Sequence, residues 1–186
     1  MFGFGKKKVS AKDAMIAYID HTAGVADDTF KNWLQYLMQS AADFNDVPLA
    51  KLAEAFGTKN VKLIYFAGLI ALDAVAIENC FDGRTASALN GKLKECLQAR
   101  MGEDGDAVAE AALHFLRRAK LQLEDMSALP HHAITFGMME LLGLDEHDET
   151  KRLFQDPLFV ASVSEPLMLV GCGWWKAFSE KMRISV

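Results

Sequence analysis

VKLIYFAGLIALDAVAI, residues 61–77, is the stretch that decides the fold. Between Leu63 and Leu72 it contains no charged side chain. Ten helical residues extend about 15 Å, half of the roughly 30 Å that a bilayer requires. On a helix, the apolar side chains of this stretch cover nearly the whole circumference, which is typical of a helix inside a protein. We therefore predict that it forms the central core helix of a soluble domain.

Helical spacing continues on both sides of this stretch. Between residues 27 and 41, Phe30, Trp33, Leu34 and Leu37 return every three or four positions, as in an amphipathic helix. No segment alternates convincingly between apolar and polar residues, so we expect no sheet. Together with capping residues, the spacing predicts helices over residues 11–24, 27–41, 47–56, 60–82, 85–101, 105–125, 130–142 and from 166 onward.

The expected fold is all-α, with about eight to ten helices in a compact orthogonal or bundle-like array around the central apolar helix near residues 60–80. A chain of 186 residues is long enough to bury a core as one domain. We expect residues 1–8 to form a flexible tail and residues 9–186 a single helical domain. The tail, MFGFGKKK, combines aromatic and basic residues. It suits contact with an anionic membrane surface, although a solvated terminus is the simpler interpretation.

Composition narrows the classes of function. The net charge of −5 disfavours a primary role in nucleic-acid binding, which needs clustered lysine and arginine. Half of the residues are hydrophobic, which predicts a large core or an apolar surface for a partner. Three cysteines, Cys80, Cys96 and Cys172, lack the spacing of a metal site and predict reduced thiols in a cytoplasmic protein.

Small residues and one carboxylate mark the middle of the central stretch. Gly68, among several alanines, predicts the close approach of another helix. Asp73 lies eleven residues after Lys62, so that both fall on one strip of the helix together with Tyr65. A carboxylate forced into the core would have a raised pKa and could serve acid–base chemistry. We expect instead that the strip reaches solvent or that Asp73 pairs with an arginine from a neighbouring helix.

A histidine-rich segment provides candidate metal ligands. His131 and His132 lie at a predicted helix start, and His147 and Asp148 follow the end of that helix. Imidazole and carboxylate groups suit zinc, iron or manganese. The adjacent His147–Asp148 pair resembles that of a helical metal-dependent phosphohydrolase family, which would imply a hydrolase. The upstream histidine and distant aspartate of that family's pattern are not placed in this sequence, so we claim no family.

Residues 52–63 have the spacing of a helix, a glycine turn and a second helix, as in a helix-turn-helix DNA-binding motif. The second helix would offer Asn60, Val61 and Tyr65, with Lys59 and Ile64, to the DNA groove. It then continues as the apolar central stretch, and the chain is acidic. DNA binding is therefore an alternative hypothesis, not the one we adopt.

No catalytic motif accompanies these patterns. Cys172, between two glycines, lacks a neighbouring base, and we interpret it as a core thiol. We expect a non-enzymatic helical interaction or adaptor protein that binds no cofactor and self-associates, with a metal-dependent hydrolase as the alternative. The expected partner contacts are Met138, Met139, Trp174 and Trp175, because flexible methionines and amphipathic tryptophans suit interfaces. Leu113 and Leu121 fall on the wet side of their helix and are scattered exposed leucines or part of a contact patch.

Overall fold

The computed structural model describes residues 6–45, 49–57, 60–124, 129–171 and 173–186. These residues form helical segments joined by short turns, together with one pair of four-residue strands. The all-α prediction is confirmed. The elements are β1 (Lys7–Ser10), α1 (Ala11–Asn45), α2 (Leu49–Phe56), α3 (Val61–Ala74), α4 (Ile77–Cys80), α5 (Gly83–Asn90), α6 (Leu93–Met101), α7 (Glu103–Glu124), α8 (Pro130–Leu141), α9 (Asp148–Gln155), α10 (Pro157–Gly171), α11 (Trp174–Lys181) and β2 (Met182–Ser185).

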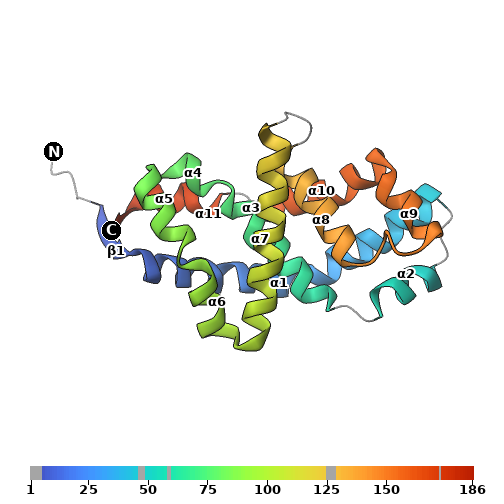
Figure 1. Ribbon diagram of the computed structural model, residues 1–186, viewed down its shortest axis with the longest axis horizontal. Coiled ribbons are helices and arrows are strands. Elements are labelled where there is room, and N and C mark those ends of the chain that lie inside the picture. Colours follow the sequence, from blue (N-terminus) through green and yellow to red (C-terminus); the bar gives the residue numbers. More distant parts are fainter. Residues whose placement is uncertain (1–5, 46–48, 58–59, 125–128, 172) are drawn as a thin grey trace.

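Helix α1 runs along the long axis of the molecule (Figure 1), and its 35 residues extend about 52 Å. It begins as predicted, because the Ser10 hydroxyl accepts a hydrogen bond from the amide of Asp13 at 3.1 Å. The predicted end at Gly24 is wrong. A glycine inside a helix costs only about 1 kcal/mol, and buried side chains continue at helical spacing on both sides of it. They include Tyr18, Thr22, Ala26, Trp33 and Leu37.

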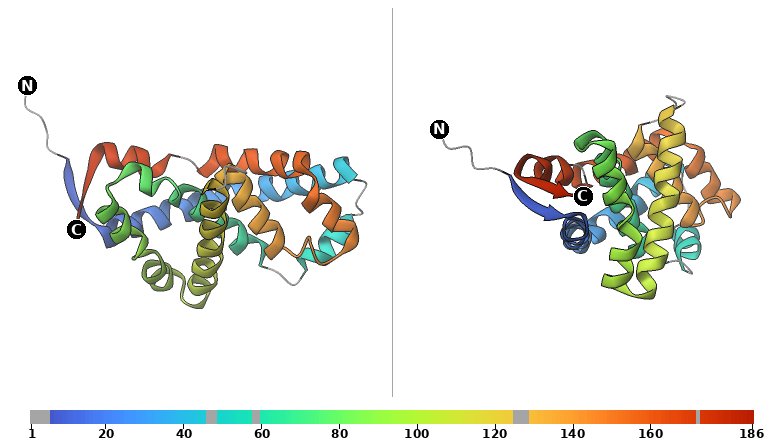
Figure 2. Two further views of the ribbon diagram at one scale, coloured as in Figure 1. Left: turned by 45° about the horizontal axis from the view of Figure 1, so that its top comes forward. Right: turned by 60° about the vertical axis from the view of Figure 1, so that its left-hand side comes forward.

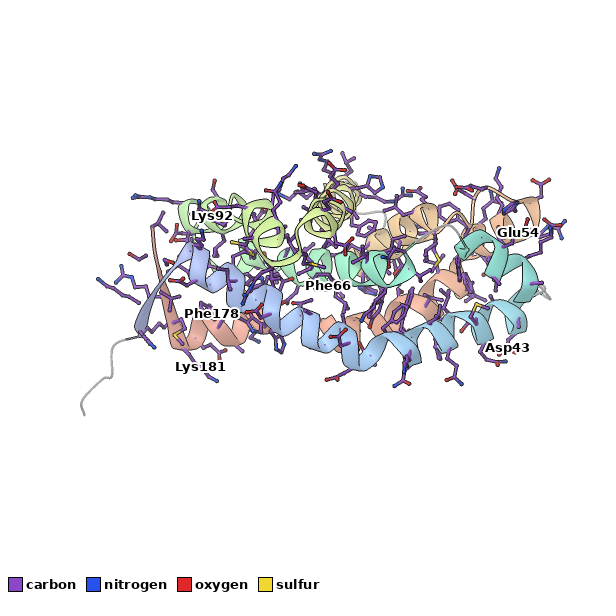
Figure 3. The ribbon with its side chains drawn as sticks, turned by 90° about the horizontal axis from the view of Figure 1, so that it is seen from below. Asp43, Glu54, Phe66, Lys92, Phe178 and Lys181 are labelled. Atoms are coloured by element: carbon purple, nitrogen blue, oxygen red, sulfur yellow. The ribbon has the colours of Figure 1, made fainter. Side chains whose placement is uncertain are left out.

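Helix α3 is the central core helix that the sequence predicts. It contacts α1, α7, α8, α10 and α11, and every residue from Tyr65 to Ala74 is buried. Its start is also as predicted, because the Asn60 side chain accepts a hydrogen bond from the amide of Leu63 at 3.2 Å. A Cβ atom at Gly68 would collide with the side chain of Met138, so the glycine does allow α8 to approach closely. Figure 3 shows Phe66 of α3 in the interior, whereas Asp43, Glu54 and Lys181 lie at the periphery.

Three predicted helices have different boundaries. The central stretch breaks after Ala74 and resumes as α4, and the helix predicted over residues 85–101 breaks at Gly91 into α5 and α6. Pro166 does not begin a new helix, because α10 starts at Pro157 and continues through it. Proline lacks the backbone N–H of an interior helical residue, yet Val163 and Leu167 beside it are anchored in the core.

The two ends of the described chain lie side by side. Strand β1 pairs in parallel with β2, and Lys7 and Lys8 are opposite Met182 and Arg183. Lys7 and Lys8 were expected in a flexible tail but belong to this small sheet. Residues 1–5 of the expected tail lie outside the described residues. The sheet was not predicted, because parallel pairing of the two ends of a chain leaves little local signal.

Helix α7 crosses the molecule at a steep angle to α1 (Figure 1). Helices α4, α5 and α6 lie on one side of α7, and α8, α9 and α10 lie on the other, as both Figure 1 and Figure 2 show. One stretch, Pro157–Lys181, is apolar and long enough to cross a membrane by length and composition. Its most apolar part is 38% buried within the protein, and the stretch includes the buried Phe159 and Trp175.

Candidate functional site

An apolar groove of about 290 Å³ lies where α3, α4, α6 and α7 meet, at the end of α5. The side chains of Ala74 and Leu93, which are 4% and 3% exposed, form its floor. The half-buried Val75, Leu113 and Leu116 form its walls. This surface, named here the α7 groove, is concave and aliphatic, as is typical of a site that buries apolar groups.

Polar side chains surround the mouth of the α7 groove. Lys120 of α7 pairs with Glu78 of α4 at 2.6 Å, and both side chains are about half exposed. Arg117 is exposed and, among the described residues, has no ion-pair partner. The amide side chains of Asn79 and Asn90 also line the groove. The mouth therefore presents hydrogen-bonding groups and one uncompensated positive charge around an apolar interior.

Only part of this groove could be predicted from the sequence. Leu113 was expected on the wet face of its helix, and it is indeed half exposed, as part of the groove wall. Leu121 of the same helix is 63% exposed. The other walls depend on the breaks at Val75 and Gly91, which were not predicted. Residues from five helices converge there, and only the tertiary structure shows that they form one surface.

A second feature is the buried carboxylate of Asp73, which is 3% exposed. It accepts a hydrogen bond from the backbone amide of Gly173 at 3.1 Å, and the neighbouring backbone amides of Trp174 and Trp175 also favour its charged form. Burial raises the pKa of Asp73 to about 6, and these three backbone amides partly oppose that rise. The carboxylate thus caps the N-terminus of α11 from another helix.

The expectation of a solvent-exposed strip is therefore wrong for two of its three members. Asp73 is buried, and Tyr65 is 1% exposed, with its hydroxyl 2.8 Å from that of Thr29. Lys62 alone reaches solvent, where it pairs with Asp27 at 2.5 Å. No arginine pairs with Asp73 within the described part of the chain. Backbone amides take the place of the expected cation.

A small cavity of about 100 Å³ adjoins Asp73, lined also by His21, Thr22, Leu69 and Trp174. A carboxyl group with a pKa near 6 can exchange a proton near neutral pH. The cavity is large enough for about three water molecules at roughly 30 Å³ each, and too small for most substrates. The geometry of Asp73 thus fits an anchor for α11 better than a general acid or base.

The candidate metal ligands fall into two pairs. His131 and His132 lie in the first turn of α8 with ring centroids 4.4 Å apart. His147 precedes α9, and Asp148 is in its first turn. Burial and the neighbouring His132 lower the pKa of His131. Among the described residues, no group of three or more histidine, cysteine, aspartate or glutamate side chains is placed to hold a metal ion.

Three of the four expected partner contacts are in the core. Met138, Met139 and Trp175 are each 0% exposed, so their side chains are not available to a partner in the folded chain. Trp174 is half-buried and stacks on Phe178, with ring centroids 4.7 Å apart. The two tryptophan rings contact each other, with centroids 4.6 Å apart, so their helical spacing does not separate them. Helix α8 packs against α3, α7 and α10, and α11 packs against α3 and α4, which explains why these side chains are buried.

The segments Ala50–Phe56 and Val61–Cys80 meet at 75°, below the roughly 90–120° of a helix-turn-helix. In addition, Tyr65 is buried, and the Asn60 side chain caps its own helix. Lys59 lies outside the described residues, as does Cys172. The second helix is enclosed by α1, α7, α8 and α10. It does not present the exposed face that a DNA groove requires.

The α7 groove and the Asp73 cavity both have the geometry of a site, and two wider, more open hollows of about 480 and 530 Å³ lie beside α5. The groove is larger than the Asp73 cavity, more apolar and rimmed by exposed polar groups. Comparison of the chain with protein-family models, with curated protein sequences and with solved structures finds no match. No relative's activity bears on either feature, and the function rests on the residues themselves.

Proposed function

We propose that this chain is a non-enzymatic, cytoplasmic interaction protein whose α7 groove receives a segment of a protein partner. The observation that supports this proposal is the aliphatic interior of the groove, open to solvent at the surface of the chain. Burial of apolar area is the main driving force of protein association. Cys80 and Cys96 are free thiols. Reduced cysteines agree with the proposed cytoplasmic location.

The chemistry of the groove defines the segment that fits it. Its volume of about 290 Å³ is at the lower limit of small-ligand pockets, which begin near 300 Å³. It suits an aliphatic or aromatic side chain from a helix better than a drug-sized molecule. Arg117, which has no ion-pair partner among the described residues, favours a carboxylate beside that side chain. The proposed occupant is thus a helical segment with an apolar anchor and an acidic neighbour.

Two fluorescent probes test these properties separately. Anilinonaphthalene sulfonate is apolar and anionic, whereas N-phenylnaphthylamine is apolar and neutral. We expect both to bind the folded protein with saturation. Leu113→Glu places a charge on the groove wall and should abolish the binding of both. Arg117→Gln should weaken only the anionic probe. Tyr36→Glu changes another exposed apolar residue, 46% exposed on α1, and serves as the control.

The outcomes separate the proposal from non-specific binding. Equal binding of both probes to wild type and Leu113→Glu would show that the α7 groove is not an apolar binding site. Loss of binding in the Tyr36→Glu control as well would point to a general effect of added charge and would also overturn the assignment. Circular dichroism of each variant checks that it is folded, which is expected because Leu113 is already half exposed.

A further inference from the structure

Helix α10 carries an exposed apolar surface. Leu158 and Leu169 are 69% and 81% exposed, the highest values among the large apolar side chains of the described residues. Glu165 is also exposed. At 100° per residue these three positions lie within about 40° of one another on the helix. Met168, 39% exposed, lies next to Leu169 and widens the surface around the helix. We name these four residues the α10 ridge.

The chemistry of the α10 ridge matches that of the α7 groove. The groove suits an apolar anchor with a carboxylate beside it. Leu169 is such an anchor, and Glu165 precedes it by one helical turn on the same face. Within the described residues neither Glu165 nor Arg117 forms an ion pair, although Glu165 is near enough to His131 to favour its charged form. Opposite charges at the edge of two apolar surfaces favour their pairing.

We propose that the occupant of the α7 groove is the α10 ridge of a second copy of this chain. Leu169 of one copy enters the groove of the next, and Glu165 meets its Arg117. This inference rests on the proposed function of the groove and names its partner. Leu113 and Leu116 form the walls against which Leu169 packs.

The position of the two surfaces determines the kind of assembly. The groove is formed with α4 and α6 on one side of α7, and α10 lies on the other side (Figures 1 and 2). A copy therefore cannot insert its own ridge into its own groove. Because groove and ridge are different surfaces, the contact is head-to-tail, and successive copies form a ring or an open chain. One helix on one groove is a small interface, below about 1,200 Å² in total, so association should depend on protein concentration.

Analytical ultracentrifugation of the full chain over a range of concentrations tests the assembly. Wild type and Tyr36→Glu should associate beyond the 20.5 kDa monomer, whereas Leu113→Glu and Leu169→Glu should each remain monomeric. A mixture of Leu113→Glu and Leu169→Glu should form a heterodimer, because one variant retains a ridge and the other a groove. A monomeric wild type, an associating Leu169→Glu or a mixture that stays monomeric would each overturn the proposal.

A charge exchange tests the contact between Glu165 and Arg117. Arg117→Glu and Glu165→Arg should each weaken association about two- to fivefold, the effect of one exposed ion pair. The double variant restores opposite charges between copies and should associate as wild type does. Equal weakening in the double variant would contradict the contact.

The probe experiment separates failure of this inference from failure of the proposed function. Probe binding to a monomeric wild type would leave the groove as a docking site and exclude a second copy as its occupant. Absence of probe binding in the monomeric Leu169→Glu variant would overturn both. If the inference is right, Leu169→Glu should bind the probes more tightly than concentrated wild type, because its groove is vacant.

Discussion

The Asp73 carboxylate of α3 accepts a hydrogen bond from the backbone amide of Gly173, one hundred residues further along the chain, at 3.1 Å. This contact joins the central helix to the start of α11. Helix α11 leads directly into β2, which pairs with β1. Asp73 thereby helps to hold the two ends of the described chain together. The contact also explains why an acidic residue is tolerated in a buried helix.

The first prediction concerns pH. The pKa of Asp73 rises from its ordinary value near 3.8 to about 6 in the folded protein, so the folded state binds this proton more tightly than the unfolded state. Its contribution to stability is fully present below about pH 4 and is lost as the pH rises through about 6. Asp73→Asn has no such titration. The stability of wild type relative to Asp73→Asn should fall by at most about 3 kcal/mol between these limits.

Urea unfolding of both proteins, followed by tryptophan fluorescence at several pH values, measures this difference. Other carboxylates titrate in the same range, and their contributions cancel in the comparison with Asp73→Asn. A stability difference that stays constant with pH would mean that the pKa of Asp73 is not raised.

A second prediction separates the charge of Asp73 from its role as a cap. Asp73→Asn keeps a side-chain oxygen that can accept the Gly173 amide, whereas Asp73→Ala removes it. Loss of the cap should make Asp73→Ala less stable than Asp73→Asn by about 0.5–2 kcal/mol. Hydrogen exchange in α11 and β2 should also be faster in the alanine variant. If the amides of α11 and β2 exchange at the same rate in the two variants, Asp73 does not anchor α11.

A third prediction uses two glycines with opposite surroundings. A Cβ atom at Gly105 would lie within collision distance of the Leu97 carbonyl group and 2.8 Å from the amide nitrogen of Gln98, both backbone atoms of α6. Gly105→Ala should therefore force α6 and α7 apart and destabilise the protein by about 1–3 kcal/mol. Gly24 has no atom within 4 Å of such a Cβ and lies inside α1. Gly24→Ala should stabilise the protein by up to about 1 kcal/mol.

Thermal unfolding of both glycine variants gives the sign of each effect. A lower midpoint for Gly24→Ala would contradict the continuous helix α1, because alanine stabilises an unstrained helix interior. An unchanged midpoint for Gly105→Ala would contradict the close packing of α6 on α7.

Local signals in the sequence were sufficient for the all-α class and for several helix ends. Asn60 and Ser10 cap their helices as predicted, because a cap and its partner amide are three residues apart. Gly24 was misread as a helix end, since its weak local preference is overridden by a buried stripe along α1. Long-range contacts had no such signal. The cap of α11 by Asp73 and the pairing of β1 with β2 join residues more than ninety positions apart.

The sequence predicted that the site would be an apolar interaction surface, but not which residues form it. The excess of apolar residues indicated an interaction surface, but Met138, Met139 and Trp175 are buried. A helix that packs on several neighbours leaves few of its apolar residues exposed. How many remain exposed depends on those neighbours and not on the sequence of the helix alone. The groove depends on where α3 and α5 end, and element boundaries are the least predictable part of a helical fold.

The last prediction concerns the ion pair at the mouth of the α7 groove. Lys120 is 2.6 Å from Glu78, and both side chains are about half exposed. Glu78→Gln removes the negative charge, so that Lys120 joins Arg117 as a second uncompensated cation. The affinity for anilinonaphthalene sulfonate should then rise about two- to fivefold, as expected for one exposed charge, and the increase should diminish in high salt. The affinity for the neutral N-phenylnaphthylamine should stay unchanged.

Glu54→Gln is the matched control. It breaks the similar exposed pair with Lys51 at 3.3 Å on α2 and changes the net charge by the same amount, away from the groove. An equal gain in Glu54→Gln would assign the effect to net charge and not to the groove mouth.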